Sequence, residues 1–115
     1  MNTENTDWMT KYYAAWDAAD VDAITDWFAD DVVVEDVPSG HVARGKAEAR
    51  AFVEGAIKLV PDATYEVVSG LVAGEYFAVE WVMHPAGLRG SSVGTLRDGK
   101  VATNRDYWNA APAKE

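Results

Sequence analysis

The fold is decided by residues 63–109, which read ATYEVVSGLVAGEYFAVEWVMHPAGLRGSSVGTLRDGKVATNRDYWN and contain apolar runs separated by turn signals. Gly74 marks the first turn and residues 85–87, Pro-Ala-Gly, mark the second. The pair Asp98-Gly99 suits a two-residue type I′ hairpin turn. We therefore expect antiparallel strands at 63–73, 76–84, 88–97 and 100–109.

The first half of the chain shows helical spacing instead. Trp8, Tyr12 and Trp16 recur on one helix face, and Asp20 is expected to cap a second helix. The apolar face of that second helix comprises Val21, Ile24, Trp27 and Phe28. A strand over 32–34 ends at Glu35-Asp36, a loop follows at 38–40, and a third helix spans 46–59. Helices followed by strands predict an α+β domain, with three helices packed on a strongly curved, mostly antiparallel sheet that encloses a cavity.

Composition limits the function classes. The 115 residues suit a single domain, 1–115, and 49% are hydrophobic, which is enough for one core. A net charge of −9 without a basic patch disfavours nucleic acid and anionic membranes. No run is long enough to span a membrane, and the N-terminus lacks a signal-peptide pattern, so we expect a cytoplasmic protein. The residues from Ala110 to Glu115 are predicted to be a tail.

Metal and thiol chemistry find little support in the sequence. There is no Cys, which excludes disulfides and thiolate ligands. His41 and His84 are the two histidines, and they form neither an H-x-H nor an i, i+4 pair. We expect no metal site and no cofactor.

Two parts of the chain resemble known enzymes. The stretches Tyr12-Tyr13-Ala14-Ala15-Trp16 and 27–36, WFADDVVVED, resemble ketosteroid isomerase. The stretches 98–101, DGKV, and 105–108, RDYW, resemble the SnoaL-like polyketide cyclases and limonene epoxide hydrolase. Together they resemble the NTF2-like superfamily, which implies a cone-shaped, cystatin-like fold over nearly the whole chain. Because this fold hosts many functions, the resemblance is more specific for fold than for chemistry.

The resemblance also implies roles for individual residues. Asp36 falls at the position of the general base of ketosteroid isomerase, and Tyr12 at that of its oxyanion-hole tyrosine. Ser92 replaces the second oxyanion donor of that enzyme. Asp106 falls at the acid–base aspartate of the SnoaL-like cyclases. The arginine and second aspartate of the epoxide hydrolase have no clear counterparts, since Glu80 and Val82 lie near those positions.

Strand alternation gives a second, independent view of the site. Residues two apart on a strand share a face, so Asn104, Asp106 and Trp108 point the same way. If Asp106 faces the cavity, Glu80 and His84 of the strand at 76–84 are expected to face it too. A carboxyl group buried among aromatic side chains gains a raised pKa and can exchange protons near neutral pH. The expected catalytic residues are Asp36, Asp106 and Tyr12, and the expected substrate-binding residues are Glu80, His84, Ser92, Asn104, Trp108 and His41.

Each candidate also has a structural interpretation. Asp36 could end a strand and cap the turn before Pro38, whereas an Asp in the middle of a strand, such as Asp106, needs a specific reason. Tyr12 lies on a helix face that would be buried in any case. Glu80 could pair with an Arg, and both histidines could face solvent. The sequence does not decide whether Asp36 or Asp106 is the base.

These observations lead to one functional hypothesis and two alternatives. We expect a cofactor-independent enzyme that abstracts a proton α to a carbonyl of a hydrophobic, steroid- or polyketide-like molecule, giving isomerisation or cyclisation. The alternatives are an epoxide hydrolase-like hydrolase and a non-catalytic small-molecule-binding protein. The resemblance also implies a homodimer formed through the open face of the sheet, where we expect Val79, Trp81 and Met83 to be exposed.

Overall fold

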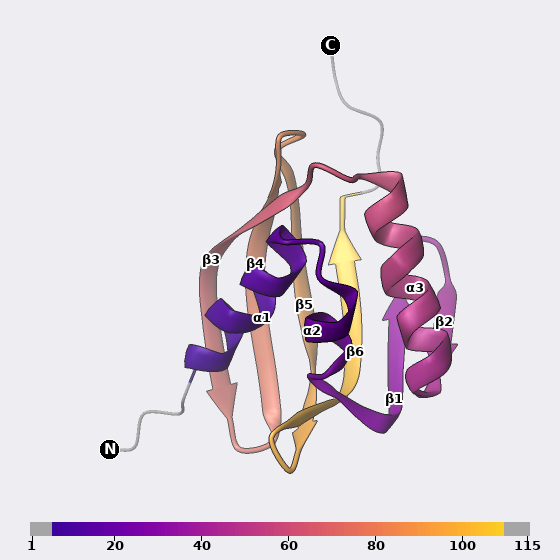
Figure 1. The fold of residues 1–115 in the computed structure, drawn as a ribbon. Coiled ribbons are helices and arrows are strands. Elements are labelled where there is room, and N and C mark those ends of the chain that lie inside the picture. The colour runs from indigo at the N-terminus through magenta and orange to yellow at the C-terminus, as the bar shows by residue number, and fades with distance from the viewer. Residues whose placement is uncertain (1–5, 110–115) are drawn as a thin grey trace.

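The computed structural model describes residues 6–109, which form three helices and a six-stranded sheet (Figure 1). The helices are α1 (Asp7–Asp17), α2 (Val21–Thr25) and α3 (Gly45–Leu59). The strands are β1 (Phe28–Asp36), β2 (His41–Arg44), β3 (Thr64–Ala73), β4 (Tyr76–His84), β5 (Leu88–Arg97) and β6 (Lys100–Trp108). The predicted tail at 110–115 and the first five residues lie outside the described residues.

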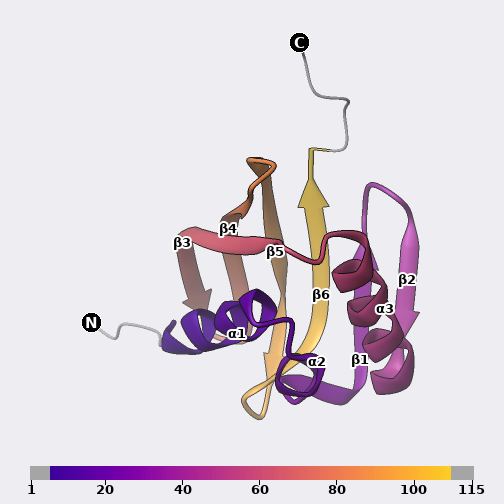
Figure 2. The ribbon, with the colours of Figure 1, turned by 45° about the horizontal axis from the view of Figure 1, so that its top comes forward.

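The sheet is mixed and open, with the strand order β2-β1-β6-β5-β4-β3. Neighbouring strands are antiparallel except for β1 and β6, which run parallel in the middle of the sheet. All three helices lie on one face (Figure 2), with α3 packed on β1 and α1 packed on β3. The α+β architecture expected from the sequence is therefore confirmed.

The core lies between the helices and this face of the sheet. Met9 of α1, Ile24 of α2, Val32 of β1 and Val53 of α3 are its largest fully enclosed side chains. Burial of one such side chain stabilises the fold by roughly 1.5–3 kcal/mol relative to leaving it in water. Because every helix contributes to this cluster, the positions of α1 and α3 over the sheet are fixed by packing.

The hairpin between β5 and β6 forms as the sequence predicts. Asp98 has φ 54° and Gly99 has φ 77°, so both central residues adopt the left-handed conformation that a type I′ turn requires. The helix predicted at 46–59 and the strands predicted at 76–84 and 88–97 also form, with bounds that match within a residue. Local signals of this kind therefore determined most of the elements.

Two predictions about the first half were wrong. The second helix ends at Thr25 rather than including Phe28, because Phe28 pairs with Val101 and the amide of Val101 bonds the Trp27 carbonyl at 2.7 Å. The sequence analysis also missed β2. This strand has only four residues and forms because the turn after Asp36 returns the chain along β1, where His41 pairs with Asp36.

Candidate active site

Asp36 and Asp106 lie side by side on the face of the sheet that the helices cover. They are register partners in the parallel β1–β6 pair, so their side chains leave the sheet at the same level. Ser92 of β5 is the register partner of Asp106 on its other side. Directly paired residues share a face, and three neighbouring strands therefore bring two carboxylates and a hydroxyl together.

Hydrogen bonds hold the Asp106 carboxyl group in place. The Ser92 hydroxyl donates to Asp106 Oδ1 at 2.6 Å, and Asn104 Nδ2 donates to the same oxygen at 2.8 Å. Ser92 Oγ in turn accepts from Trp81 Nε1 at 3.0 Å and from the Tyr13 hydroxyl at 3.5 Å. The result is a chain of polar groups that runs from α1 and β4 through β5 to β6.

Glycine residues on β5 make room for the side chains of this hydrogen-bonded network. Gly90 pairs with Trp81, and a Cβ built on Gly90 would lie 2.5 Å from Cη2 of the Trp81 ring. A Cβ on Gly94 would lie 1.9 Å from the Thr103 carbonyl oxygen. Because β5 carries no side chain at Gly90, the Trp81 indole packs on the strand there and its Nε1 reaches Ser92. The absence of a side chain at Gly94 leaves room for the Thr103 carbonyl group of β6.

Burial changes the proton affinity of the site. Removal from water raises the pKa of Asp106, and the neighbouring charge of Asp36 raises it further, while the bonds from Ser92 and Asn104 oppose the shift. Burial likewise raises the pKa of Tyr65, of β3, to about 12. A carboxyl group in these surroundings takes up a proton more readily than one in water.

Three tyrosine hydroxyls lie near enough to Asp106 for its charge to act on them. Burial raises the pKa of Tyr12 and of Tyr13, and the negative charge of Asp106 acts in the same direction on both and on Tyr65. The Trp16 side chain acts in the opposite direction and lowers the pKa of Tyr12. Because an indole only donates, the proton of Tyr12 remains available for another acceptor. Tyr12 is therefore placed as a neutral hydrogen-bond donor near the carboxylates.

Asp36 has a partner of its own. The Trp108 indole Nε1 donates to Asp36 Oδ1, and Asp36 is half-buried at the end of β1. The structure therefore brings together six of the predicted site residues, namely Tyr12, Asp36, Ser92, Asn104, Asp106 and Trp108.

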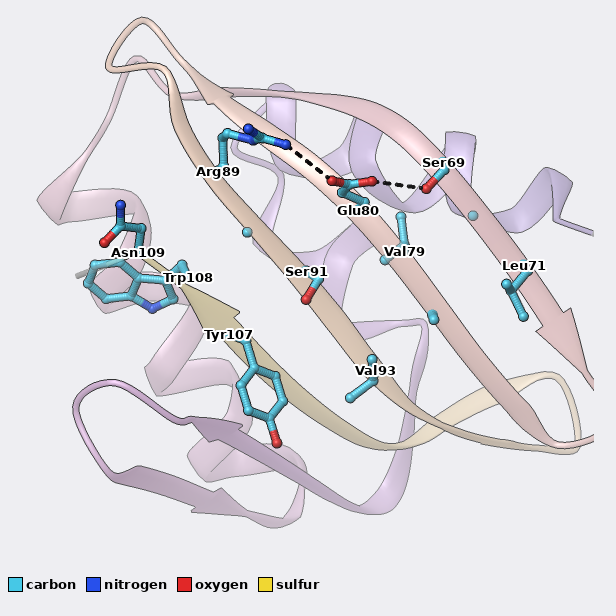
Figure 3. A pocket seen from close by; sticks show the side chains of 13 residues that line it. Ser69, Leu71, Val79, Glu80, Arg89, Ser91, Val93, Tyr107, Trp108 and Asn109 are labelled. Carbon is cyan, nitrogen blue, oxygen red and sulfur yellow. Dashed lines mark hydrogen bonds and ion pairs between the residues drawn. The ribbon is translucent and has the colours of Figure 1, made fainter. Parts of the chain in front are cut away.

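Glu80 and His84 do not belong to this group, and the expectation that they face Asp106 was wrong. The register pairs Val79 with Ser92, so Val79 shares the face of Asp106 and Glu80 points to the opposite face. Glu80 instead accepts from Ser69 at 3.3 Å and lies 3.6 Å from Arg89 (Figure 3). His84 is exposed and lies 2.9 Å from Glu66.

His41 lies next to Asp36, as its register partner across β1 and β2. Its ring stacks on Phe52 of α3, with centroids 5.7 Å apart and planes inclined by 10°. The residue is exposed on β2, at the edge of the sheet. The ring of His41 therefore lies against Phe52 at the edge of the site.

We also expected Val79, Trp81 and Met83 to be exposed on the open face of the sheet, and this prediction was wrong. Val79 is 2% and Trp81 is 6% exposed, and Met83 packs against the core, so all three point toward the helices. The uncovered face carries Leu71, 58% exposed, and Tyr107, 43% exposed, instead. We call this uncovered face the outer face.

Two hollows occur within residues 6–109, one on the outer face and one beside Tyr65. The larger is an open groove of about 640 Å³ on the outer face, lined by Leu71, Glu80, Val93 and Tyr107 among others (Figure 3). The smaller, about 10 Å³, lies between α1, α3 and Tyr65 and is large enough for about one water molecule. Neither hollow is lined by Asp106 or Asp36. On this side of the sheet, where we expected a cavity, the aromatic rings of Tyr12, Tyr13, Tyr65 and Trp81 pack against one another.

Several apolar side chains near the carboxylate end of the sheet are only partly buried, and we call this set the ring. Strands β1, β4 and β6 all end on this side of the sheet, where the pairs Asp36–Asp106 and Met83–Leu88 form. The ring comprises Trp16, Phe52, Ile57, Tyr65, Met83, Leu88 and Trp108, which are all partly buried. Side chains that keep some exposure move more easily than enclosed ones.

The sequence analysis missed three residues of the site: Tyr13, Tyr65 and Trp81. Tyr13 adjoins Tyr12 and was expected only as part of the helix. Trp81 was assigned to the outer face because the register between β4 and β5 was unknown. Strand alternation places Trp81 and Val79 on the same face of β4. Knowledge that Val79 contacts the helices would therefore have placed Trp81 on the helix-covered face as well.

No group of three or more His, Cys, Asp or Glu side chains within the described residues is arranged to hold a metal ion. None of the helices at 6–109 combines the length and the apolar character that a membrane span requires.

Comparison with known proteins identifies the family. A profile of the SnoaL-like domain matches residues 9–104, and the chain therefore belongs to the SnoaL-like family. A comparison with curated protein sequences finds no significant match.

Solved structures share the fold at low sequence identity. One is a protein of ketosteroid isomerase-like fold from Catenulispora acidiphila, in complex with trimethylamine, with TM-score 0.83, 17% identity, and 93% of this chain and 88% of that chain covered. A candidate polyketide cyclase from Sinorhizobium meliloti has TM-score 0.77 and 24% identity, covering 89% and 94%. The epoxide hydrolase/cyclase-like enzyme SalBIII, of pyran ring formation in salinomycin, has TM-score 0.75 and 22% identity, covering 89% and 88%.

Proposed function

We propose that this SnoaL-like protein is an acid–base enzyme acting on a small hydrophobic molecule. It removes a proton from the carbon α to a carbonyl group of that molecule, and Asp106 is the group that takes the proton. The observation that carries the proposal is the surroundings of Asp106. Its carboxyl group lies beside Asp36, its charge acts on three nearby tyrosines, and burial raises its pKa. General acid–base catalysis is most effective when the pKa of the catalytic group lies near the working pH.

The reaction needs only side chains of this chain. The Asp106 carboxylate takes a proton from the carbon next to the carbonyl. The electron pair of the broken C–H bond forms the C=C bond of an enolate, and the π pair of the C=O bond moves to the oxygen. Tyr12 donates a hydrogen bond to the enolate oxygen that forms. In an isomerisation, Asp106 returns the proton to another carbon. In a cyclisation, the enolate carbon attacks a second carbonyl and Asp106 protonates the resulting alkoxide.

Asp36 supports this step by its charge. Trp108 donates to Asp36 Oδ1 and holds this carboxyl group beside Asp106. A negative charge on Asp36 increases the proton affinity of Asp106 next to it. We therefore assign proton transfer to Asp106 and tuning of that group to Asp36.

The substrate would enter through the ring of partly buried apolar side chains. Because aromatic side chains fill the interior around Asp106, a substrate reaches the carboxyl group only when some of them move aside. Tyr65 and Trp16, which line the small hollow, are in position for this movement. The apolar character of the ring supports a hydrophobic substrate.

Epoxide opening of the limonene epoxide hydrolase type has less support. That chemistry requires an arginine beside the acid, and Arg105 points away from Asp106 on β6, with its Nε donating to Tyr107 on the outer face. The ion pairs of arginine within residues 6–109 join Arg50, Arg89 and Arg97 to other acids.

We also propose that two copies associate through the outer face. Leu71 and Tyr107 are exposed there beside a groove of about 640 Å³, and exposed apolar groups arranged in this way favour association. The helices would then remain on the outside of the dimer.

Substitution of the two carboxylates tests the catalytic proposal. Asp106→Asn and Asp36→Asn are assayed on a β,γ-unsaturated ketosteroid and on a polyketide-like β-keto ester, beside Asp30→Asn as the matched control on β1. Asp30 is exposed. Loss of the acid–base group should lower turnover by about 10²–10⁴-fold in Asp106→Asn. Wild-type turnover in Asp106→Asn would refute the proposal, and binding without turnover by the wild type would indicate a binding protein.

A further inference from the structure

We propose that Ser92 is a positioning residue that holds Oδ1 of Asp106 and leaves Oδ2 as the oxygen that meets the substrate. This inference rests on the proposed acid–base function of Asp106. It also changes the role expected for Ser92. The resemblance to ketosteroid isomerase implied that Ser92 donates a hydrogen bond directly to the substrate. The Ser92 hydroxyl is fully engaged by protein groups, and its effect on a substrate is therefore exerted through Asp106.

The direction of each hydrogen bond at Ser92 is fixed by its partners. A serine hydroxyl has one proton and two lone pairs. Trp81 Nε1 can only donate, and it reaches Ser92 Oγ at 3.0 Å, while the Tyr13 hydroxyl reaches the same atom at the longer distance of 3.5 Å. Both contacts use lone pairs of Ser92, so its single proton is directed to Asp106 Oδ1 at 2.6 Å.

The two oxygens of Asp106 are consequently unequal. Ser92 and Asn104 both donate to Oδ1, and no hydrogen bond within residues 6–109 ends on Oδ2. Among the described residues, Trp8 Nε1 is the side-chain polar atom that is fully enclosed without a partner, so Oδ2 is not sealed in the interior. An oxygen without a hydrogen-bond donor is the one that can take a proton from a ligand once the aromatic side chains have moved aside.

Ser92 is itself rigidly placed. It is 3% exposed, it lies on a strand paired on both sides, and the flat Trp81 ring covers it where β5 has glycine. Its partner Asp106 is surrounded by Asp36 from β1, Tyr12 and Tyr13 from α1, and Tyr65 from β3. These groups are negative or neutral, so Ser92 and Asn104 supply the stabilising contacts to the ionised carboxylate.

Titration of Asp106 tests the inference directly. The 13Cγ shift of Asp106 is followed against pH in the wild type and in Ser92→Ala, with Ser91→Ala as the matched control on the outer face. Loss of a hydrogen bond to a charged group should raise the apparent pKa of Asp106 by about one to two pH units in Ser92→Ala. Ser91→Ala should leave it unchanged, and Ser92→Thr, which keeps the hydroxyl, should restore it.

Trp81→Phe provides a second variant in case Ser92→Ala does not fold. It keeps an aromatic ring but removes the donor to Ser92 Oγ, which weakens the donation of Ser92 to Asp106. The pKa of Asp106 should then rise by a few tenths of a pH unit. An unchanged titration of Asp106 in Ser92→Ala or in Trp81→Phe, or an equal shift in Ser91→Ala, would overturn the role of Ser92.

The kinetic result separates this inference from the catalytic proposal. Ser92→Ala should lower kcat by about 10–100-fold with little change in KM, because the carboxyl group is misoriented and not removed. If Asp106→Asn retains full turnover while Ser92→Ala still shifts the titration, the catalytic proposal fails and the positioning stands. If Asp106→Asn is inactive while Ser92→Ala changes neither kcat nor the titration, the positioning role is refuted.

Discussion

Replacing Gly90 by Ala should disturb the site without touching a polar group. The added Cβ would lie 2.5, 2.7 and 2.9 Å from three atoms of the Trp81 ring, against the 3.4 Å at which ordinary contact begins. The ring is rigid and 6% exposed, so it must withdraw as a whole. Its Nε1 then leaves Ser92 Oγ, and the hydrogen bond at 3.0 Å is lost.

The expected loss of stability follows from these two effects. Overpacking of a buried position costs typically 1–3 kcal/mol. The lost hydrogen bond contributes about 0.5–1.5 kcal/mol. We therefore expect the free energy of unfolding to fall by about 2–4 kcal/mol in Gly90→Ala.

Urea unfolding followed by circular dichroism measures this loss, since the chain has five Trp and its fluorescence does not report on Trp81 alone. The 15N–1H signal of the Trp81 indole reports the hydrogen bond itself. Gly55→Ala is the matched control, because Gly55 is exposed in α3 with no atom near its added Cβ. This control should gain up to about 1 kcal/mol. Unchanged stability and an unchanged Trp81 signal in Gly90→Ala would refute the packing argument.

Three further results are expected. Burial raises the pKa of Asp106 above its ordinary 3.8, so folding takes up a proton there and stability falls as the pH rises through the raised pKa. Asp106→Asn cannot ionise, so its stability relative to the wild type should increase as the pH rises above 3.8, which urea unfolding at each pH would show. A difference that stays constant with pH would contradict the assignment. Gly99→Ala should destabilise the β5–β6 hairpin by about 1–2 kcal/mol, because φ at this position is 77°, and an unchanged midpoint of thermal unfolding would count against it. The double variant Leu71→Asp and Tyr107→Asp should sediment as a monomer at concentrations where the wild type is a dimer, and equal sedimentation would argue against association through the outer face.

Local signals in the sequence were sufficient for the elements of the second half. The Asp98-Gly99 pair predicts its turn because only a few residues adopt a positive φ at low cost. The cap at Asp20 is confirmed by the bond from the Ala23 amide to its side chain at 3.1 Å. Each of these features depends on residues close together in the chain, which is why pattern alone reveals it.

The site depended on information that the sequence does not carry. Asp36, Asp106, Asn104 and Ser92 were singled out individually, yet their contact requires the parallel pairing of β1 with β6 and the register between β5 and β6. The error at Glu80 has the same origin. A change of one residue in strand register moves every side chain to the other face, and pattern alone did not fix the register of β4 against β5.

The sequence by itself determined the α+β order of elements, their main turns and the presence of carboxylates where polar residues are disfavoured. The tertiary structure decided which carboxylates meet, which tyrosines and indoles surround them, and that Glu80 and His84 face away. The physical reason is the range of the interactions involved. Turns and helices arise from neighbours along the chain, whereas desolvation and hydrogen bonding at Asp106 arise from segments that meet only when the helices pack on the sheet.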